Sequence, residues 1–173
     1  MYNGKVFNFS ELLNLNWRRE FLNATEIKQL VTRTEHAAEQ HQLQPEELFL
    51  FKLFDFNFLY DDEQEICRIE VPMNEILLGP LKFIHGGFIT YLADTCMGHL
   101  CFRYLDEPFV ALELKTQYLK SVQESVIVAE ARFRKKGKTI LFIDCDVMTK
   151  DGIPLSNISA TFYVLPDKKK DKE

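Results

Sequence analysis

Residues 85–104 are the segment that most restricts the fold of this chain, because they are apolar on nearly every side of a helix. Such a helix must be buried on most sides. We therefore expect a long central helix with the remaining elements wrapped around it. Its apolar members are Phe88, Ile89, Tyr91, Leu92, Ala93, Cys96, Met97, Leu100, Cys101 and Phe102.

Strand patterns flank this segment on both sides. Upstream, a phenylalanine-rich run over 49–58 and an apolar run over 66–71 are separated by Asp61-Asp62-Glu63, which indicates a short helix leading into a β-hairpin. Downstream, turn signals at 136–138 and 150–152 divide strands that begin near 125, 139 and 155. The order of strands, buried helix and strands predicts an α+β fold. The strand that starts at Phe109 should bury one face, formed by Val110, Leu112, Leu114, Thr116 and Tyr118.

The N-terminal part of the chain has a helical pattern instead. Apolar residues recur at helical spacing between Asn23, a candidate N-cap, and Pro45, and they are Ile27, Leu30, Val31, Thr34 and Ala38. A second short helix or packed arm is expected over residues 10–22. A chain of 173 residues has room for one main core. We assign residues 1–47 to an N-terminal helical extension packed on the domain, 48–165 to the main domain, and 166–173 to a charged disordered tail.

Composition excludes several classes of function. The formal net charge of -5 argues against a broad nucleic-acid-binding surface. Four cysteines without CxxC spacing, and no signal-peptide pattern, indicate a cytoplasmic protein with reduced thiols. No apolar run reaches the roughly 18 to 20 residues of a membrane span. Cys96, His99 and Cys101 match no common zinc spacing, so no metal is expected, and no GxSxG elbow supports a serine hydrolase.

Asp94 and the Gly86-Gly87 pair are the features of the central helix that need explaining. A buried carboxylate without a partner is unfavourable and raises its own pKa, so Asp94 either pairs within the core or serves a reaction. The glycines either form a simple turn into the helix or leave backbone N–H groups open to a ligand. The helix dipole adds about half a positive charge at that end. An oxyanion or a polarised carbonyl would suit it.

The spacing of these residues makes a prediction about assembly. Gly86 and Asp94 are eight residues apart, which on a helix corresponds to about 12 Å along the axis. They cannot act on one carbonyl within a single chain. If both serve one reaction, a second helix must run antiparallel beside the first, so that a two-fold interface creates two equivalent sites.

The run His85-Gly86-Gly87-Phe88-Ile89-Thr90-Tyr91-Leu92-Ala93-Asp94-Thr95 resembles the HGG-x5-LADT signature of the phenylacetate-type (PaaI-like) hotdog thioesterases, relatives of the 4-hydroxybenzoyl-CoA thioesterases. The resemblance continues through Tyr118-Leu119 and the turn Gly137-Lys138-Thr139, and covers about residues 48–165. It implies a hotdog fold, in which a curved antiparallel sheet wraps a long central helix, here with extra N-terminal helices. It further implies a homodimer or homotetramer that hydrolyses acyl-CoA thioesters.

By motif position, the resemblance gives each site residue a role. The Gly86 amide, with Gly87 beside it, would polarise the thioester carbonyl, and Asp94 of the partner subunit would activate water or attack directly. His85 would shape the loop. Thr95, Phe88 and Tyr91 are expected on the substrate side. Coenzyme A is part of the substrate, and no separate cofactor is expected.

Coenzyme A needs cations for its phosphates. A local group of basic residues meets that need, although the net charge of the whole chain is negative. The alternative is that these residues form an ordinary solvated hairpin tip. The group comprises Arg132, Arg134, Lys135, Lys136 and Lys138.

Two positions depart from the family pattern. Family members carry an Asn shortly before HGG, whereas Asn74 lies eleven residues before His85. They also often place Ser or Thr on the strand after the helix, near where Ala111 stands. These departures keep a second hypothesis open, in which the chain is a non-catalytic hotdog protein that binds acyl-CoA. A hotdog dehydratase would need a differently placed catalytic histidine, a context that His99 lacks.

Overall fold

The computed structural model describes residues 23–44, 48–79, 83–123 and 126–166. The arm expected over residues 10–22 and nearly all of the expected charged tail lie outside these ranges. The elements run in the order α2 (Ala24–Leu43), α3 (Phe49–Leu53), β1 (Asn57–Asp61), β2 (Ile66–Pro72), the 3-10 helix η1 (Glu75–Leu77), α4 (Gly86–Tyr104), β3 (Phe109–Tyr118), β4 (Val126–Lys136), β5 (Ile140–Thr149) and β6 (Pro154–Val164).

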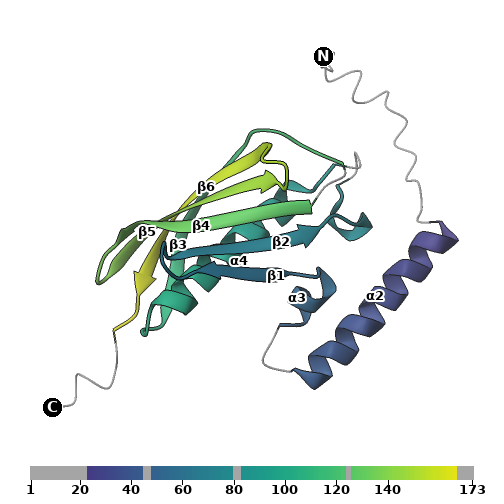
Figure 1. The fold of residues 1–173 in the computed structure, drawn as a ribbon, viewed down its shortest axis with the longest axis horizontal. Helices are drawn as coiled ribbons and strands as arrows, with labels where there is room; N and C mark the ends of the chain where they lie inside the picture. The colour runs from purple at the N-terminus through teal and green to yellow at the C-terminus, as the bar shows by residue number, and fades with distance from the viewer. Residues whose placement is uncertain (1–22, 45–47, 80–82, 124–125, 167–173) are drawn as a thin grey trace.

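The predicted α+β layout is confirmed. Six antiparallel strands form one curved sheet in the order β1-β2-β4-β5-β6-β3, and α4 lies against its inner face (Figure 1). The predicted first hairpin is present, with the Asp61 side chain accepting hydrogen bonds from the Glu63 and Gln64 amides. Gly152 supplies the positive φ of 81° in the predicted Asp-Gly turn between β5 and β6. β1 and β3 are the two edge strands.

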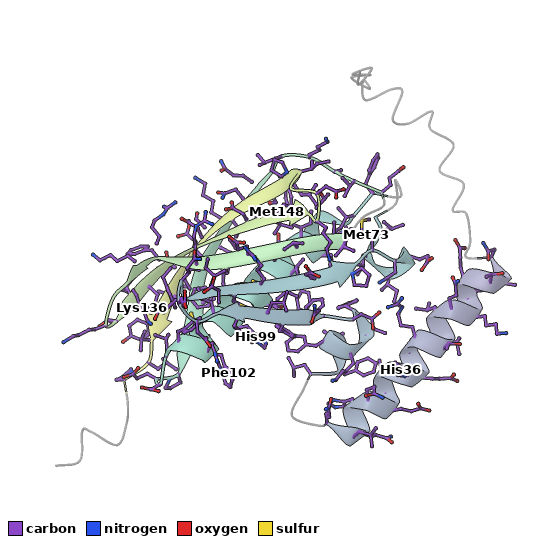
Figure 2. The ribbon with its side chains drawn as sticks, viewed as in Figure 1. His36, Met73, His99, Phe102, Lys136 and Met148 are labelled. Carbon is purple, nitrogen blue, oxygen red and sulfur yellow. The ribbon has the colours of Figure 1, made fainter. Side chains whose placement is uncertain are left out.

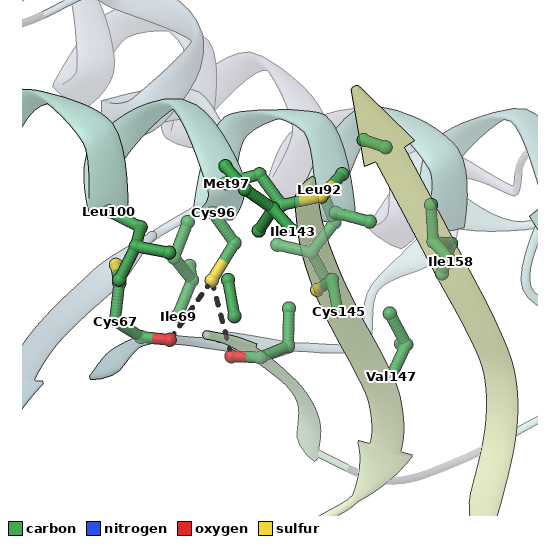
Figure 3. Packing of buried hydrophobic residues seen from close by; sticks show 14 of the residues in the cluster. Cys67, Ile69, Leu92, Cys96, Met97, Leu100, Ile143, Cys145, Val147 and Ile158 are labelled. Carbon is green, nitrogen blue, oxygen red and sulfur yellow. Dashed lines mark hydrogen bonds between the residues drawn. The ribbon is translucent and has the colours of Figure 1, made fainter. Parts of the chain in front are cut away.

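The core lies between α4 and the sheet. Leu92, Cys96, Met97 and Leu100 are fully buried on the helix, and their sheet partners include Ile143 (Figure 3). The Cys96 thiol points at the backbone carbonyl oxygens of Cys67 and Ala129, at 3.2 and 3.5 Å. The buried thiol therefore has hydrogen-bond acceptors. Burial raises the pKa of Cys96 well above its usual value. These packed residues hold the start of α4 in a fixed position.

Strand β3 differs from its predicted pattern. Val110, Leu112 and Tyr118 were expected on a buried face, but they are 42%, 60% and 56% exposed. For Val110 and Leu112 the reason is a β-bulge between Ala111 and Glu113, which moves the alternation by one residue, whereas Tyr118 keeps the side of Leu114 and Thr116 and is exposed as the last residue of the strand. Leu114 still packs on the core, whereas Val110 and Leu112 are left on an open edge strand.

Helix α2 has the predicted bounds but packs through a different face. Asn23 caps it in a reciprocal capping box with Glu26. Ile27 and Val31 were expected to face inward, yet they are 50% and 49% exposed, while Ala37 is buried. α2 packs mainly on the five-residue α3, which is too short to cover a wide apolar face (Figure 1). The ion pair of Arg33 with Asp55 helps to fix its rotation.

Candidate active site

The start of α4 is built around His85. Its backbone N–H donates to the Leu77 carbonyl at 2.8 Å, and its side-chain Nδ1 accepts from the Gly87 N–H at 3.0 Å. His85 is therefore the N-cap, and the ring, when neutral, carries its proton on Nε2. A Cβ on Gly87 would come within 3.0 Å of this ring. The absence of a side chain at Gly87 thus leaves room for the capping His85 ring. The Gly87 N–H already donates to that ring.

The Gly86 amide is free at this helix start. Among the described residues nothing accepts a hydrogen bond from its N–H, whereas its carbonyl accepts from the Tyr118 hydroxyl at 3.0 Å. A Cβ on Gly86 would lie 3.1 to 3.3 Å from the Tyr118 ring. The glycine therefore lets β3 approach closely, and the tyrosine anchors the residue whose N–H is open to a ligand.

A chain of hydroxyl groups holds this geometry. Thr90 Oγ1 lies 2.9 Å from the Tyr118 hydroxyl, 3.3 Å from Thr116 Oγ1 and 3.3 Å from the Gly86 carbonyl oxygen. Thr90, Thr116 and Tyr118 were not assigned to the site from the sequence. The signal was present, because Thr90 lies within the HGG-containing run and Thr116 and Tyr118 share one side of a strand.

Asp94 lies on the open side of α4. Its carboxylate has no hydrogen-bond or ion-pair partner among the residues that the structure describes. Partial burial raises the pKa of Asp94 above its usual value, because the surrounding protein removes water from the charged form. The alternative prediction was that Asp94 pairs with another group in the core. The described part of the chain contains no such partner.

A single chain keeps the two candidate groups apart. Gly86 begins α4 and Asp94 stands eight residues later in the same unbroken helix, so the expected axial separation of about 12 Å applies. Both residues remain accessible from outside the chain, next to the exposed edge of β3. One subunit thus holds the two candidate groups at separate positions on one helix.

Phe88 and Tyr91 belong to an aromatic cluster beside the first turns of α4. Phe54 meets Phe88 edge-on at 5.1 Å between ring centroids, and Phe56 lies 6.0 Å from Tyr91. Both partners come from the segment that joins α3 to β1. The cluster gives the start of the helix an apolar flank on the side away from β3. Thr95 has a different environment, because its hydroxyl donates to the Tyr91 carbonyl of its own helix at 2.8 Å.

The structure separates the predicted basic residues. Arg132 and Arg134 pair with Asp146 and Asp144 on the outer face of the sheet, each at 2.8 Å. Lys136 instead lies over the Tyr104 ring at 5.8 Å and pairs with Glu65 at 2.7 Å. Lys135 and Lys138 are exposed, and no carboxylate of the described residues pairs with them. Lys136 therefore lies at the C-terminal end of α4, opposite to Gly86 in its own chain, whereas Lys135 pairs in register with Phe142 on the outer face of the sheet.

Asn74 and Ala111 are the two positions that depart from the family pattern. Asn74 caps η1 by accepting from the Ile76 amide at 3.1 Å, so its side chain is engaged there. Ala111 lies beside the bulge of β3 and brings no hydroxyl.

His99 does not form a metal site with its neighbours. Its Nδ1 lies 2.9 Å from the Tyr60 hydroxyl, and its ring stacks on Phe58 with 4.1 Å between centroids. Burial lowers the pKa of His99. No group of three His, Cys, Asp or Glu side chains suited to a metal ion occurs in the described ranges. None of the described helices is long and apolar enough to cross a bilayer.

Comparison with protein families identifies residues 81–155 as matching the model of the thioesterase superfamily. This stretch contains all of α4 and reaches the first residues of β6. The predicted resemblance to thioesterases is thus confirmed at the level of the superfamily over the segment that contains Gly86 and Asp94. No curated protein matches the chain.

Solved structures confirm the hotdog fold. A protein from Bacillus halodurans, crystallised with CoA, aligns with a TM-score of 0.76 and 22% identity, over 86% of this chain and 99% of its own. The PaaI protein of E. coli, from the phenylacetic acid degradation operon, gives 0.64 and 16%, over 78% and 96% of the two chains. A thioesterase from Haemophilus influenzae gives 0.63 and 19%, over 67% and 82%. At these identities the likeness concerns the fold.

Proposed function

We propose that this chain hydrolyses acyl-CoA thioesters at two sites that form between the α4 helices of a homodimer. The observation that carries the proposal is a pair of groups on α4 without partners among the described residues, the Gly86 N–H and the Asp94 carboxylate. In an antiparallel pair of helices, Gly86 of one subunit would face Asp94 of the other. The superfamily match over residues 81–155 supports the thioester as substrate.

Each group has a defined task in this proposal. The Gly86 N–H, aided by the positive end of the helix dipole, donates to the thioester oxygen as negative charge develops on it. Asp94 from the partner subunit either removes a proton from water, which attacks the carbonyl, or attacks the carbonyl itself to form an anhydride that water then hydrolyses. In both cases the CoA thiolate leaves and the free acid is released. Water is the second substrate, so the proposed reaction asks for no cofactor. Four unpaired, buried cysteines suit a cytoplasmic setting, which we propose as the location.

The dimer is proposed from two adjoining surfaces. The edge of β3 that faces away from β6 presents Val110 and Leu112 to solvent, and α4 leaves Asp94 exposed. A long exposed edge with apolar residues favours pairing with another strand. Pairing of two β3 strands would extend the sheets and bring the two α4 helices alongside each other.

Substrate contacts follow from the same arrangement. The aromatic cluster around Phe88 and Tyr91 flanks Gly86 of its own chain and would take the acyl group. We propose Lys138, with Lys136 near it, as the cations for the CoA phosphates. Lys135 contributes less, because it pairs in register with Phe142 on the outer face of the sheet. Arg134 contributes less, because Asp144 already neutralises it.

The test is CoA release from short, long and aromatic acyl-CoAs, followed as free thiol. We expect Asp94→Asn to lower kcat by about 10²- to 10⁴-fold, as for loss of a positioned base. Gly86→Pro removes the N–H at a first helical position that tolerates proline, and should lower kcat by roughly 10²- to 10³-fold. Gly86→Ala is its matched control, because alanine crowds Tyr118 similarly but keeps the donor. Undiminished turnover by Asp94→Asn would remove Asp94 from the mechanism.

A second candidate is an acyl-CoA-binding protein without turnover, and Ala111 favours it because that position offers no hydroxyl to orient water or the carboxylate. The two candidates separate in one comparison. Calorimetry would show saturable binding of acyl-CoA in both cases. Free thiol would appear only if the chain is an enzyme.

A further inference from the structure

Helix α2 carries an apolar stripe that the described elements leave half exposed. Ile27 and Val31 form this stripe, and they stand four residues apart, which places them one above the other on one side of the helix. In Figure 2 the side chains on the outer side of α2, the helix that carries His36, project away from the other described elements. The stripe is therefore a surface on which another segment can pack.

The described contacts of α2 lie on a different side of the helix. Arg33 pairs with Asp55, and Ala37 is the one buried residue of α2. Both lie about 120° around the helix from the stripe of Ile27 and Val31. Helices in proteins gain most of their stability from packing of an apolar face, and α2 has 20 residues but buries one. A cover on the stripe would therefore stabilise α2.

The chain supplies a candidate cover directly before α2. Residues 10–22, for which the sequence predicts a short helix or packed arm, lead into Asn23, the N-cap of α2. Leu13 and Trp17 are four residues apart, so a helix would place them on one side. Their spacing equals that of the two stripe residues, and four residues span about 6 Å on each helix.

The connection between the two segments determines which residues meet. Two antiparallel helices are joined by a loop of about 2 to 5 residues. With residues 20–22 as this loop, Trp17 lies opposite Ile27 and Leu13 lies opposite Val31. Both apolar pairs form in one arrangement, without any change in the described structure.

We propose that the apolar stripe of α2 is the docking surface for residues 10–22 of the same chain, which fold back on it as an antiparallel helical hairpin. The Trp17 ring covers Ile27, and the Leu13 side chain covers Val31. This assignment does not rest on the proposed function, because it concerns a surface that no substrate reaches in that proposal.

The docking supports the aromatic cluster from a distance. Arg33 of α2 pairs with Asp55, and Asp55 stands between Phe54 and Phe56, whose rings meet the first turns of α4. A segment that holds α2 in place therefore also holds the partner of Asp55.

Fluorescence of the full chain tests the proposal, because Trp17 is the only tryptophan in the sequence. We expect its emission maximum in the folded chain to lie to the blue of the value in urea. The double variant Ile27→Glu, Val31→Lys replaces the stripe by a Glu–Lys pair at a spacing that stabilises a helix. It should shift the emission maximum to the urea value and raise acrylamide quenching to the level measured in urea.

The matched control is the double variant Lys28→Glu, Thr32→Lys, which places the same pair one residue further along α2. Both positions are exposed and lie outside the stripe, so the emission of Trp17 should not change. Leu13→Glu is a second test from the other side of the contact. It should shift the emission to the red and leaves every residue of α2 unchanged.

Four results would overturn the assignment. The first is a parent emission that already equals the urea value. The second is a blue emission that survives in both the stripe variant and Leu13→Glu, and the third is an equal shift in the control. The fourth is a blue emission that is lost on dilution, which would assign the stripe to a second copy of the chain. No substrate is present in these measurements, so failure of hydrolysis leaves the result intact.

Discussion

Asp94 combines partial burial with the lack of a partner in the described structure, and this has a consequence for stability. Its pKa is raised by desolvation, so the folded state holds a proton on this group more tightly than the unfolded chain does. Between the unfolded value of about 3.9 and the higher folded value, stability therefore falls as pH rises. Above that window the charged Asp94 disfavours folding.

Asp94→Asn should therefore raise the melting temperature at pH 7, and the gain should shrink as pH falls toward about 4. Thermal unfolding of parent and variant at both pH values measures this. Asp106→Asn, a change at an exposed position just after α4, should show no such pattern. A variant that melts earlier than the parent at pH 7 would mean that the carboxylate stabilises the fold, contrary to our account.

Hydrolysis should also depend on Asp94, but it requires the ionised carboxylate, which is the form that disfavours folding. Because the base must be ionised, kcat should decrease as pH falls through the raised pKa of Asp94. A rate that stays constant down to pH 4 would argue against Asp94 as the base.

Single residues also show what sequence reasoning could and could not reach. The sequence predicted that Gly86 and Asp94 lie on one helix, and α4 contains both residues without a break. The sequence could not reveal that Lys136 lies on the other face of β4 from Arg132 and Arg134. A bulge between Phe133 and Lys135 causes this change, and bulges depend on the register of the neighbouring strand.

At the scale of elements, α4 and the hairpins followed from local patterns. A helix that is apolar on all sides must be buried in the core. An Asp-Gly pair strongly favours a tight turn between two strands. The position of β3 at a sheet edge did not follow, because strand order arises from long-range pairing. The rotation of α2 also depends on a distant contact, the pairing of Arg33 with Asp55.

The exposed edge of β3 gives a prediction about assembly. Leu112→Glu should shift the protein from dimer to monomer and reduce hydrolysis at least tenfold, since a charge on an edge strand opposes pairing with another strand. Sedimentation velocity and thiol release measure the two effects. Leu59→Glu is the matched control, because Leu59 is 42% exposed on β1, the opposite edge. If Leu59→Glu dissociates the dimer and Leu112→Glu does not, the interface lies at the other edge.

For the whole molecule, the central claim is that each active site takes its amide from one subunit and its carboxylate from the other. One continuous helix carries both groups, so the hotdog fold of a single chain separates them, and only the two-fold axis could bring them together. Each dimer should therefore contain two equivalent sites.

The most direct test mixes two inactive variants, Gly86→Pro and Asp94→Asn, after dissociating and reassociating the subunits. A heterodimer of the two holds one site with an intact Gly86 amide and an intact Asp94, and one site that lacks both. With random pairing at equal amounts, half of the dimers are heterodimers, so about a quarter of the parental activity should return. Activity that stays at the level of the separate variants, with heterodimers present, would contradict the shared site.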